Sequence, residues 1–141
     1  MTWTAESQPR AVALSEVETA ADLLVASFAA HDRDAYFASF APDSTFVFHT
    51  SAQRFGSRTD YEQEWARWEA DGFHVESCES SNRHIDLITH EVAVMTHRVR
   101  TRIAGVDEVQ LERETIVFRR GRDGRWLAVH EHLSPDPGED A

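Results

Sequence analysis

A chain of 141 residues, with 41% hydrophobic and 10% aromatic residues, suits one globular domain that buries its core without disulfide or metal support. The formal net charge of −11 repels nucleic acid and anionic membrane surfaces, so neither is an expected partner. All 14 basic residues are arginine, and Cys78 is the only cysteine. Schiff-base catalysis by lysine, an intrachain disulfide and a zinc site built on several thiolates are therefore excluded.

The chain divides into three expected segments. Residues 1–14 show little periodicity and predict a flexible arm, residues 15–134 predict the domain, and residues 135–141 predict a disordered acidic tail. The amino-terminal residues do not resemble a signal peptide, and no apolar stretch reaches the ~20 residues of a membrane span. We therefore expect a cytoplasmic protein.

The amino-terminal half predicts three helices and a short strand. Ser15 and Glu18 form a capping box, which predicts a helix over residues 16–30 with an apolar stripe. Asp32 is expected to cap a second, short helix that Pro42 ends. The other elements of this half are a strand at residues 45–49 and a helix between Ser57 and Gly72.

The second half predicts strands separated by turns, the clearest being the hairpin signal at Gly121–Gly124. The strands are expected at residues 73–87, 90–103, 107–120 and 125–134. Helices followed by a meander are typical of the α+β class, with the helices covering one face of a curved antiparallel sheet. Such a sheet leaves a cup in which a small ligand can bind.

Several of these segments resemble nuclear-transport-factor-2-like (NTF2-like) proteins. The resemblance rests on Asp32–Tyr36, on Phe40–Asp43 and on the last strand. In that strand Trp126, Val129, His130, His132 and Ser134 are similar in spacing to the association domain of calcium/calmodulin-dependent protein kinase II and to bacterial SnoaL-like proteins of the third subgroup. The resemblance implies a cone-shaped, cystatin-like roll that is usually dimeric, and it implies no single chemistry.

The same resemblance indicates which kinds of functional site are not expected in this chain. Members that act as steroid isomerases carry a tyrosine and an aspartate at positions that look like Leu24 and Phe48 here, so that kind of site is not expected. The arginines of the association-domain pocket look replaced by Val99, Ile116 and Leu133. The pocket should therefore be more apolar and a poor binder of carboxylates.

Strand periodicity assigns residues of the last strand to the two faces of the sheet. Leu127, Val129, Glu131 and Leu133 are expected to face the cup, and Trp126, Ala128, His130 and His132 to face outward. A homodimer interface is expected on the outer face, formed by Trp126, His130, His132, Arg98 and Arg113. The two histidines supply only two metal ligands, so we expect no metal and no cofactor.

On the cup face, periodicity brings His97 and Glu114 together with Glu131 in apolar surroundings. These residues could form a general acid–base site, and a buried ion pair with a structural role is the alternative. The residues expected to contact a ligand are His49, Trp65, Trp68, Met95, Val99, Ile116 and Leu133. Trp65 and Trp68 also fit a core role.

Two functions remain open from the sequence. A small-molecule binding protein, with or without acid–base catalysis, predicts an enclosed cavity of roughly a few hundred Å³ beside His97 and a carboxylate. An assembly module resembling the kinase association domain predicts a filled pocket and a large apolar contact on the outer face. We favour the first because polar residues on an inner face destabilise the fold unless they are used or paired.

Overall fold

The predicted order of helices and strands is present in the computed structural model, which describes residues 7–138. The elements are α1 (Ser7–Ala29), α2 (Arg33–Ala38), β1 (Phe40–Phe48), α3 (Arg58–Ala70), β2 (Val75–Thr89), β3 (Val92–Ile103), β4 (Gln110–Arg120) and β5 (Trp126–Pro135). The α+β class is confirmed. Within the described residues, no helix is long and apolar enough to cross a bilayer.

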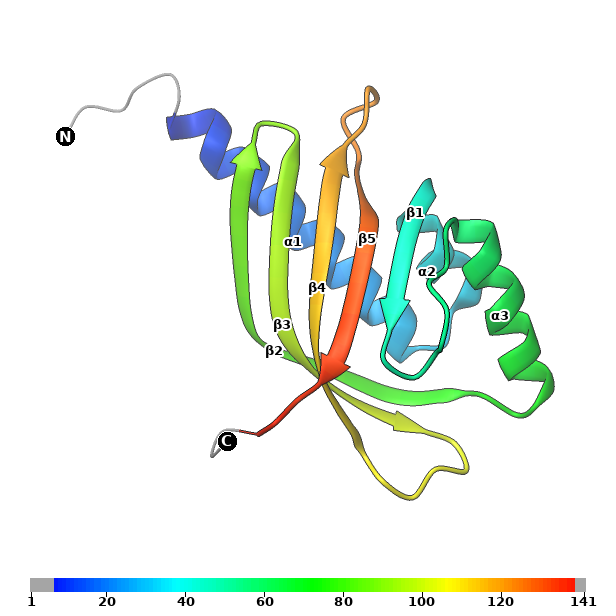
Figure 1. Ribbon diagram of the computed structural model, residues 1–141. Helices are drawn as coiled ribbons and strands as arrows, with labels where there is room; N and C mark the ends of the chain where they lie inside the picture. The colour runs from blue at the N-terminus through cyan, green and yellow to red at the C-terminus, as the bar shows by residue number, and fades with distance from the viewer. Residues whose placement is uncertain (1–6, 139–141) are drawn as a thin grey trace.

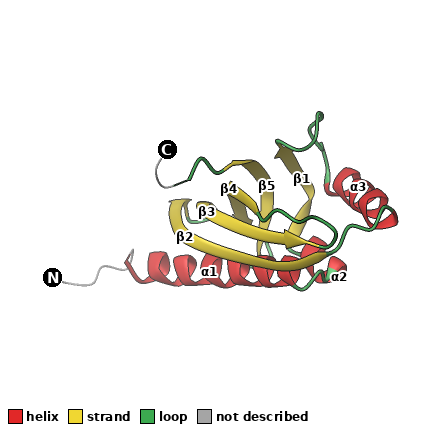
Figure 2. Ribbon diagram, turned by 90° about the horizontal axis from the view of Figure 1, so that it is seen from below, coloured by secondary structure: helices red, strands yellow, loops and turns green. Residues whose placement is uncertain are grey.

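The five strands form one sheet in the order β1-β5-β4-β3-β2. Strands β2 to β5 form the predicted antiparallel meander, whereas β1 is added at the edge parallel to β5. The sheet is strongly curved, with α1 lying across one face and α2 and α3 beside the β1 end (Figures 1 and 2). Because of this curvature, the concave face of the sheet points toward the helices.

The first helix begins earlier than the sequence predicted. Helix α1 starts at Ser7, so residues 7–14 belong to a helix and not to a flexible arm. The reason is that Ala13, which is 8% exposed and lies one turn before Val17, extends the apolar stripe beyond the expected start. Residues 1–6 of the expected arm and 139–141 of the expected tail lie outside the described residues.

Two other boundaries differ from the prediction. Helix α2 ends at Ala38, and β1 already begins at Phe40, so Pro42 lies in a strand and does not end the helix. Proline is tolerated there because β1 is an edge strand. At the other end of the chain Pro135 closes β5, and the N–H of Asp136 donates to the carbonyl of Leu111 over 3.0 Å.

The largest part of the core is an aromatic cluster between β1, α2 and α3. Tyr36, Phe37, Phe40, Tyr61 and Trp65 are all at most 5% exposed and contact one another mainly edge to face. Helix α3 is held in this position by Ser57, whose hydroxyl oxygen accepts from the N–H of Asp60 as the sequence predicted. The cluster fixes the two tyrosines at the concave side of the sheet.

A bulge in β5 reverses which side chains of its first part face the core, so the predicted faces of that part are wrong. Val117 pairs with His130 but Phe118 pairs with Ala128, so Val129 is an extra residue in the ladder. Trp126 and Ala128 are therefore buried, and the expectation that Leu127 and Val129 face the cup is wrong. Trp126 is 6% exposed, with its indole N–H 3.4 Å from a Glu16 carboxylate oxygen on α1, so it lies in the core and not on the outer face.

We therefore expect Trp126→Ala to lower the free energy of unfolding by about 3 kcal/mol, because it empties a buried site beneath α1. Leu127→Ala, at the neighbouring half-buried position, is the control and should have a clearly smaller effect. Urea denaturation followed by circular dichroism measures both. Equal effects of the two substitutions would contradict the assignment of Trp126 to the core.

Candidate functional site

A cavity of about 150 Å³ lies between the concave face of the sheet and the helices. Much of its wall is aromatic, from Phe28, Phe48, Trp68 and Phe73. The ionisable side chains in its wall are Tyr36, Tyr61, Cys78, His97, Glu112, Glu114 and Glu131. The cavity is smaller than the sequence led us to expect, and it combines an apolar wall with a concentrated group of acids.

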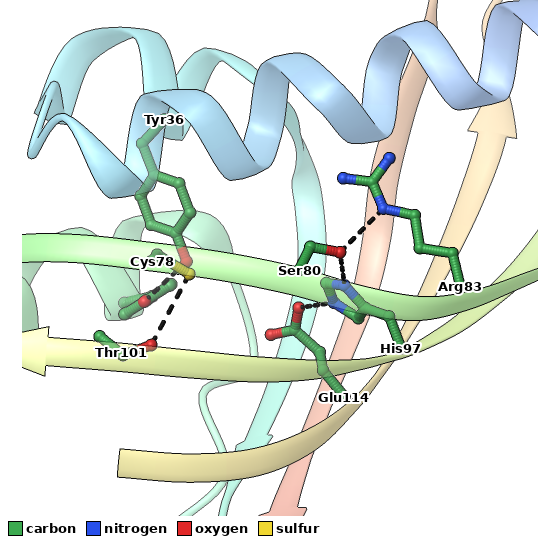
Figure 3. A network of polar contacts seen from close by, with 8 residues as sticks. Tyr36, Cys78, Ser80, Arg83, His97, Thr101 and Glu114 are labelled. Carbon is green, nitrogen blue, oxygen red and sulfur yellow. Dashed lines mark hydrogen bonds and ion pairs between the residues drawn. The ribbon is translucent and has the colours of Figure 1, made fainter. Parts of the chain in front are cut away.

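A chain of hydrogen bonds crosses β2, β3 and β4 beside this cavity (Figure 3). Arg83 Nε donates to Ser80 Oγ over 2.8 Å, and Ser80 Oγ lies 2.6 Å from His97 Nδ1. His97 Nε2 lies 2.7 Å from Glu114 Oε1. Arg83 also contacts the carboxylate of Asp22 on α1. The chain thus joins the helix surface to the buried carboxylate.

The direction of donation along the chain follows from its ends. Arg83 can only donate, so the Ser80 hydroxyl accepts from it and is available to donate to His97 Nδ1. His97 then carries its proton on Nε2 and donates to Glu114. Burial and the nearby Arg83 charge lower the pKa of His97 to about 4, which keeps the imidazole neutral.

Strand register explains why these groups meet. His97 is directly opposite Glu114 on the β3–β4 ladder, and Ile116 of the same strand is opposite Glu131 on β5. Neighbours on one face of an antiparallel pair lie within side-chain reach. His97, Glu114 and Glu131 therefore come together on the concave face, where the sequence pattern placed them.

Glu114 and Glu131 form a hydrogen-bonded carboxyl pair. Burial raises the pKa of Glu114 to about 7, and burial together with the Glu114 charge raises the pKa of Glu131 well above its ordinary value. Glu114 also accepts from His97 Nε2, which favours its ionised form, so the proton of the pair is assigned to Glu131. Glu131 Oε2 has no partner.

A pair of tyrosines adds hydroxyl groups to the same cavity. The Tyr36 and Tyr61 hydroxyl oxygens lie 2.9 Å apart. Burial raises the pKa of both well above its usual range, so both stay protonated. Because their mutual bond uses one hydroxyl hydrogen, the other is available to an acceptor in the cavity. The sequence placed Tyr36 and Tyr61 within predicted helices, and nothing in it indicated the pair.

The thiol of Cys78, which also lines the cavity, is unsuited to nucleophilic chemistry. Burial raises the pKa of the Cys78 thiol to about 11, and its sulfur lies 3.6 Å from the hydroxyl of Thr101 (Figure 3). A protonated thiol is a weak nucleophile. Glu112 Oε2 lies 2.6 Å from His49 Nε2, and burial raises the pKa of Glu112.

The residues expected to contact a ligand separate into two groups. Trp68, Val99 and Leu133 line the cavity. Trp65, Met95 and Ile116 are completely buried in the core outside the cavity wall, and His49 reaches it only through Glu112. Trp65 differs because α3 turns that ring toward the aromatic cluster.

The outer face of the sheet carries the two histidines of β5. His130 Nδ1 lies 2.8 Å from Thr45 Oγ1, and His132 is exposed. Among the described residues, no three histidine, cysteine or acidic side chains are grouped to hold a metal ion. Arg98 lies 3.6 Å from Asp136, and Arg113 is exposed. Of the five expected interface residues, only Trp126 is buried in the core.

Sequence reasoning missed Ser80 and Arg83. The β2–β3 pairing is irregular between Ser81 and His84, so simple alternation along β2 cannot place Arg83 beside Ser80. The only available signal was the opposite charge of Asp22 and Arg83, which are 61 residues apart.

Solved structures with the same arrangement define the fold class as NTF2-like. An NTF2-like protein of unknown function from Pseudomonas putida is 19% identical, with 92% of each chain covered and a TM-score of 0.76. A ketosteroid isomerase-like protein from Erwinia carotovora is 15% identical, with 89% of this chain and 97% of that chain covered and a TM-score of 0.74. An NTF2-like protein from Rhodospirillum rubrum is 19% identical, with 85% and 98% covered and a TM-score of 0.72. At these identities the likeness concerns the fold alone.

The family is shown by sequence. The profile described as SnoaL-like domain matches residues 17–137, which is most of the chain, so the protein belongs to the SnoaL-like domain family. A search among curated proteins finds no match.

Replacing Glu131 should change how stability depends on pH. Folding raises the pKa of Glu131, so the folded protein keeps a proton that the unfolded chain releases above about pH 4.3. The contribution of Glu131 to stability is therefore largest in acid and decreases as the pH rises. In Glu131→Gln this decrease is absent, and the variant should gain on the wild type by up to about 1.4 kcal/mol per pH unit.

Urea denaturation between about pH 5 and pH 8 measures this difference. The two proteins should be nearly equal near pH 5, because a protonated carboxyl and an amide both donate to Glu114. Glu76→Gln, at an exposed position of β2, is the control. Parallel pH profiles of the Glu131 variant and the wild type would contradict the protonated state of Glu131.

Proposed function

We propose that this protein binds a small, ring-sized organic molecule in the cavity and transfers protons to and from it through the Glu114–Glu131 pair. The observation that supports this most directly is the pair of buried carboxyl side chains, Glu114 and Glu131, in the cavity wall. Two buried carboxyl groups side by side destabilise a fold, and their retention fits a role toward a bound molecule.

The carboxyl pair has the arrangement of a proton relay. Glu131 can accept a proton from a ligand on one carboxyl oxygen while its other oxygen passes a proton to Glu114. Return of the proton along the same path makes the pair a general acid. A pKa of about 7 for Glu114 suits both directions near neutral pH. His97 positions Glu114 by donating from Nε2.

The alternative of a non-catalytic assembly module receives less support. It predicts a filled pocket, whereas a cavity lies beside the carboxyl pair. Dimerisation through the face of the sheet opposite α1 is compatible with the proposal and carries no chemistry of its own (Figure 2).

Steroid-isomerase chemistry of the usual kind is not part of the proposal. Leu24 and Phe48, the positions that resemble its tyrosine and aspartate, both line the cavity and are apolar. The Erwinia carotovora neighbour is described as ketosteroid isomerase-like, and that description belongs to it. Proton transfer here would depend on β4 and β5 residues.

Binding can be tested with toluene, since cavities of about 150 Å³ hold one benzene-sized ring. Toluene should cause saturable chemical-shift changes at the cavity residues with a Kd of about 1 mM or below. Val99→Phe fills the cavity and should abolish them, whereas Thr96→Phe, exposed on the same strand, should not. Thermal unfolding checks that both variants are folded. Unchanged toluene binding in a folded Val99→Phe variant would exclude the cavity as the binding site.

Proton transfer can be tested with hydroxyacetone, a small α-hydroxy ketone with exchangeable C–H protons. In D₂O the wild type should accelerate exchange of these protons above the buffer rate, and Glu131→Gln and Glu114→Gln should each reduce the acceleration by about 100-fold or more. Proton NMR follows the exchange, and Glu76→Gln should behave as wild type. Full exchange activity in both variants, or none in the wild type, would refute the relay.

A further inference from the structure

We infer that His49 and Glu112 form the path by which the protons of the Glu114–Glu131 pair exchange with solvent. This inference rests on the proposed proton transfer in the cavity and adds two residues to it. A buried pair that takes a proton from one ligand must release it before it can act again, so a route to water is required. Three observations carry the inference: the isolation of the buried pair, a contact between the cavity wall and an exposed imidazole, and the position of Glu112 beside Glu114.

The first observation is the isolation of the carboxyl pair from solvent. The side chains of His97 and Glu114 are 1% and 10% exposed, and Glu131 is 4% exposed. Beyond His97 the chain of hydrogen bonds continues through the Ser80 hydroxyl to Arg83. A guanidinium keeps its protons at neutral pH, so the chain in that direction ends on a group that does not release a proton.

The second observation is a contact that leads out of the cavity. His49 Nε2 lies 2.6 Å from Glu112 Oε2. Glu112 lines the cavity with a side chain that is 12% exposed, whereas the side chain of His49 is 30% exposed. Of the ionisable side chains in the cavity wall, all from the described part of the chain, Glu112 is the one that bonds to an exposed ionisable side chain.

The end of β1 explains how His49 reaches this position. Phe48 is the last residue of β1 and lines the cavity, so strand alternation alone would turn His49 to the convex face. A turn begins there instead, and the N–H of Ser51 donates to the carbonyl of Phe48 over 3.1 Å. His49 is therefore released from the strand pattern and reaches past β5 to Glu112 on β4.

The third observation is the position of Glu112 relative to Glu114. Both residues line the cavity, and they are alternate residues of β4, so their backbones are about 6.8 Å apart on one face. One water molecule or a ligand hydroxyl can connect their carboxyl groups, and the cavity of about 150 Å³ has room for it. Burial raises the pKa of Glu112, and the bond with His49 opposes this, so Glu112 takes up a proton more readily than an exposed carboxylate.

Proton transfer along this path balances at every residue. On the way out, Glu114 gives its proton to the bridging oxygen, which passes one of its own to Glu112. Glu112 then protonates His49 Nε2 while His49 Nδ1 releases its proton to bulk water. On the way in, each step is reversed. Exchange of one hydrogen for one deuterium uses each direction once, so both carboxyl groups and the imidazole return to their starting states.

The path can be tested through the exchange of hydroxyacetone C–H protons in D₂O at low buffer concentration. His49→Ala should reduce the wild-type acceleration about tenfold or more, because an abstracted proton then returns to the substrate more often than it leaves. Free imidazole should restore most of the rate, since it can replace the missing base beside Glu112. Pyrazole has the same size but is barely basic, so it should not. His90→Ala, in the exposed turn between β2 and β3, is the matched control and should behave as wild type.

A second variant tests whether the two residues share one path. Glu112→Gln keeps the size of the side chain but cannot carry a proton, so it should reduce exchange as much as His49→Ala. Imidazole should not rescue it, and the double variant should be no slower than Glu112→Gln. A melting temperature and a Kd for toluene near those of the wild type show that the fold and the cavity are intact in each variant.

The outcomes separate this inference from the proposed function. If the wild type accelerates exchange and His49→Ala does so equally, the path is overturned and proton transfer in the cavity stands. A loss of exchange in His49→Ala that imidazole does not restore, or that pyrazole restores equally well, would assign His49 a structural role and also overturn the path. If the wild type does not accelerate exchange, the proposed proton transfer fails and the path fails with it.

Discussion

The stability of this structure depends on how it accommodates ionisable side chains on the concave, buried face of a curved sheet. His97 and Glu114 are 4% and 9% exposed and directly opposite each other on β3 and β4. Ionised groups in such surroundings are destabilising unless they are hydrogen-bonded or neutralised. The protein meets this requirement with the neutral imidazole of His97, the protonated carboxyl of Glu131 and, between these two donors, the carboxylate of Glu114. Arg83 fixes the direction of donation along the chain of hydrogen bonds.

The cavity exists because this polar chain and the aromatic cluster occupy different parts of the concave face. Aromatic rings from α2, α3 and β1 fill the space at one end of the sheet. Beside them, shorter side chains such as Cys78, Val99 and Thr101 leave the opening. The tyrosine pair stands at the boundary, with rings in the cluster and hydroxyl groups in the cavity wall. The packing of the aromatic cluster and the polar groups of the cavity wall are thus connected through Tyr36 and Tyr61.

The sequence predicted the fold class and the inner faces of β3 and β4, because regular antiparallel strands keep the side-chain period of two. It failed for Trp126, since one extra residue at Val129 reverses the faces of the preceding part of β5. Ser80 and Arg83 were missed because the register of β2 is irregular beside them. The tyrosine hydroxyl pair depends on how α2 and α3 pack, and helical spacing alone carries no information about that.

The parallel pairing of β1 with β5 affects how the protein folds while it is being translated. Thr45 of β1 and its partner His130 are 85 residues apart, so β1 leaves the ribosome roughly 4 to 17 s before the neighbouring strand β5. Phe40, Phe46 and Phe48 are exposed to other nascent chains during that interval unless α3 covers them first. Docking of α3 on β1 before β5 is synthesised would cover these rings and reduce aggregation of the new polypeptide.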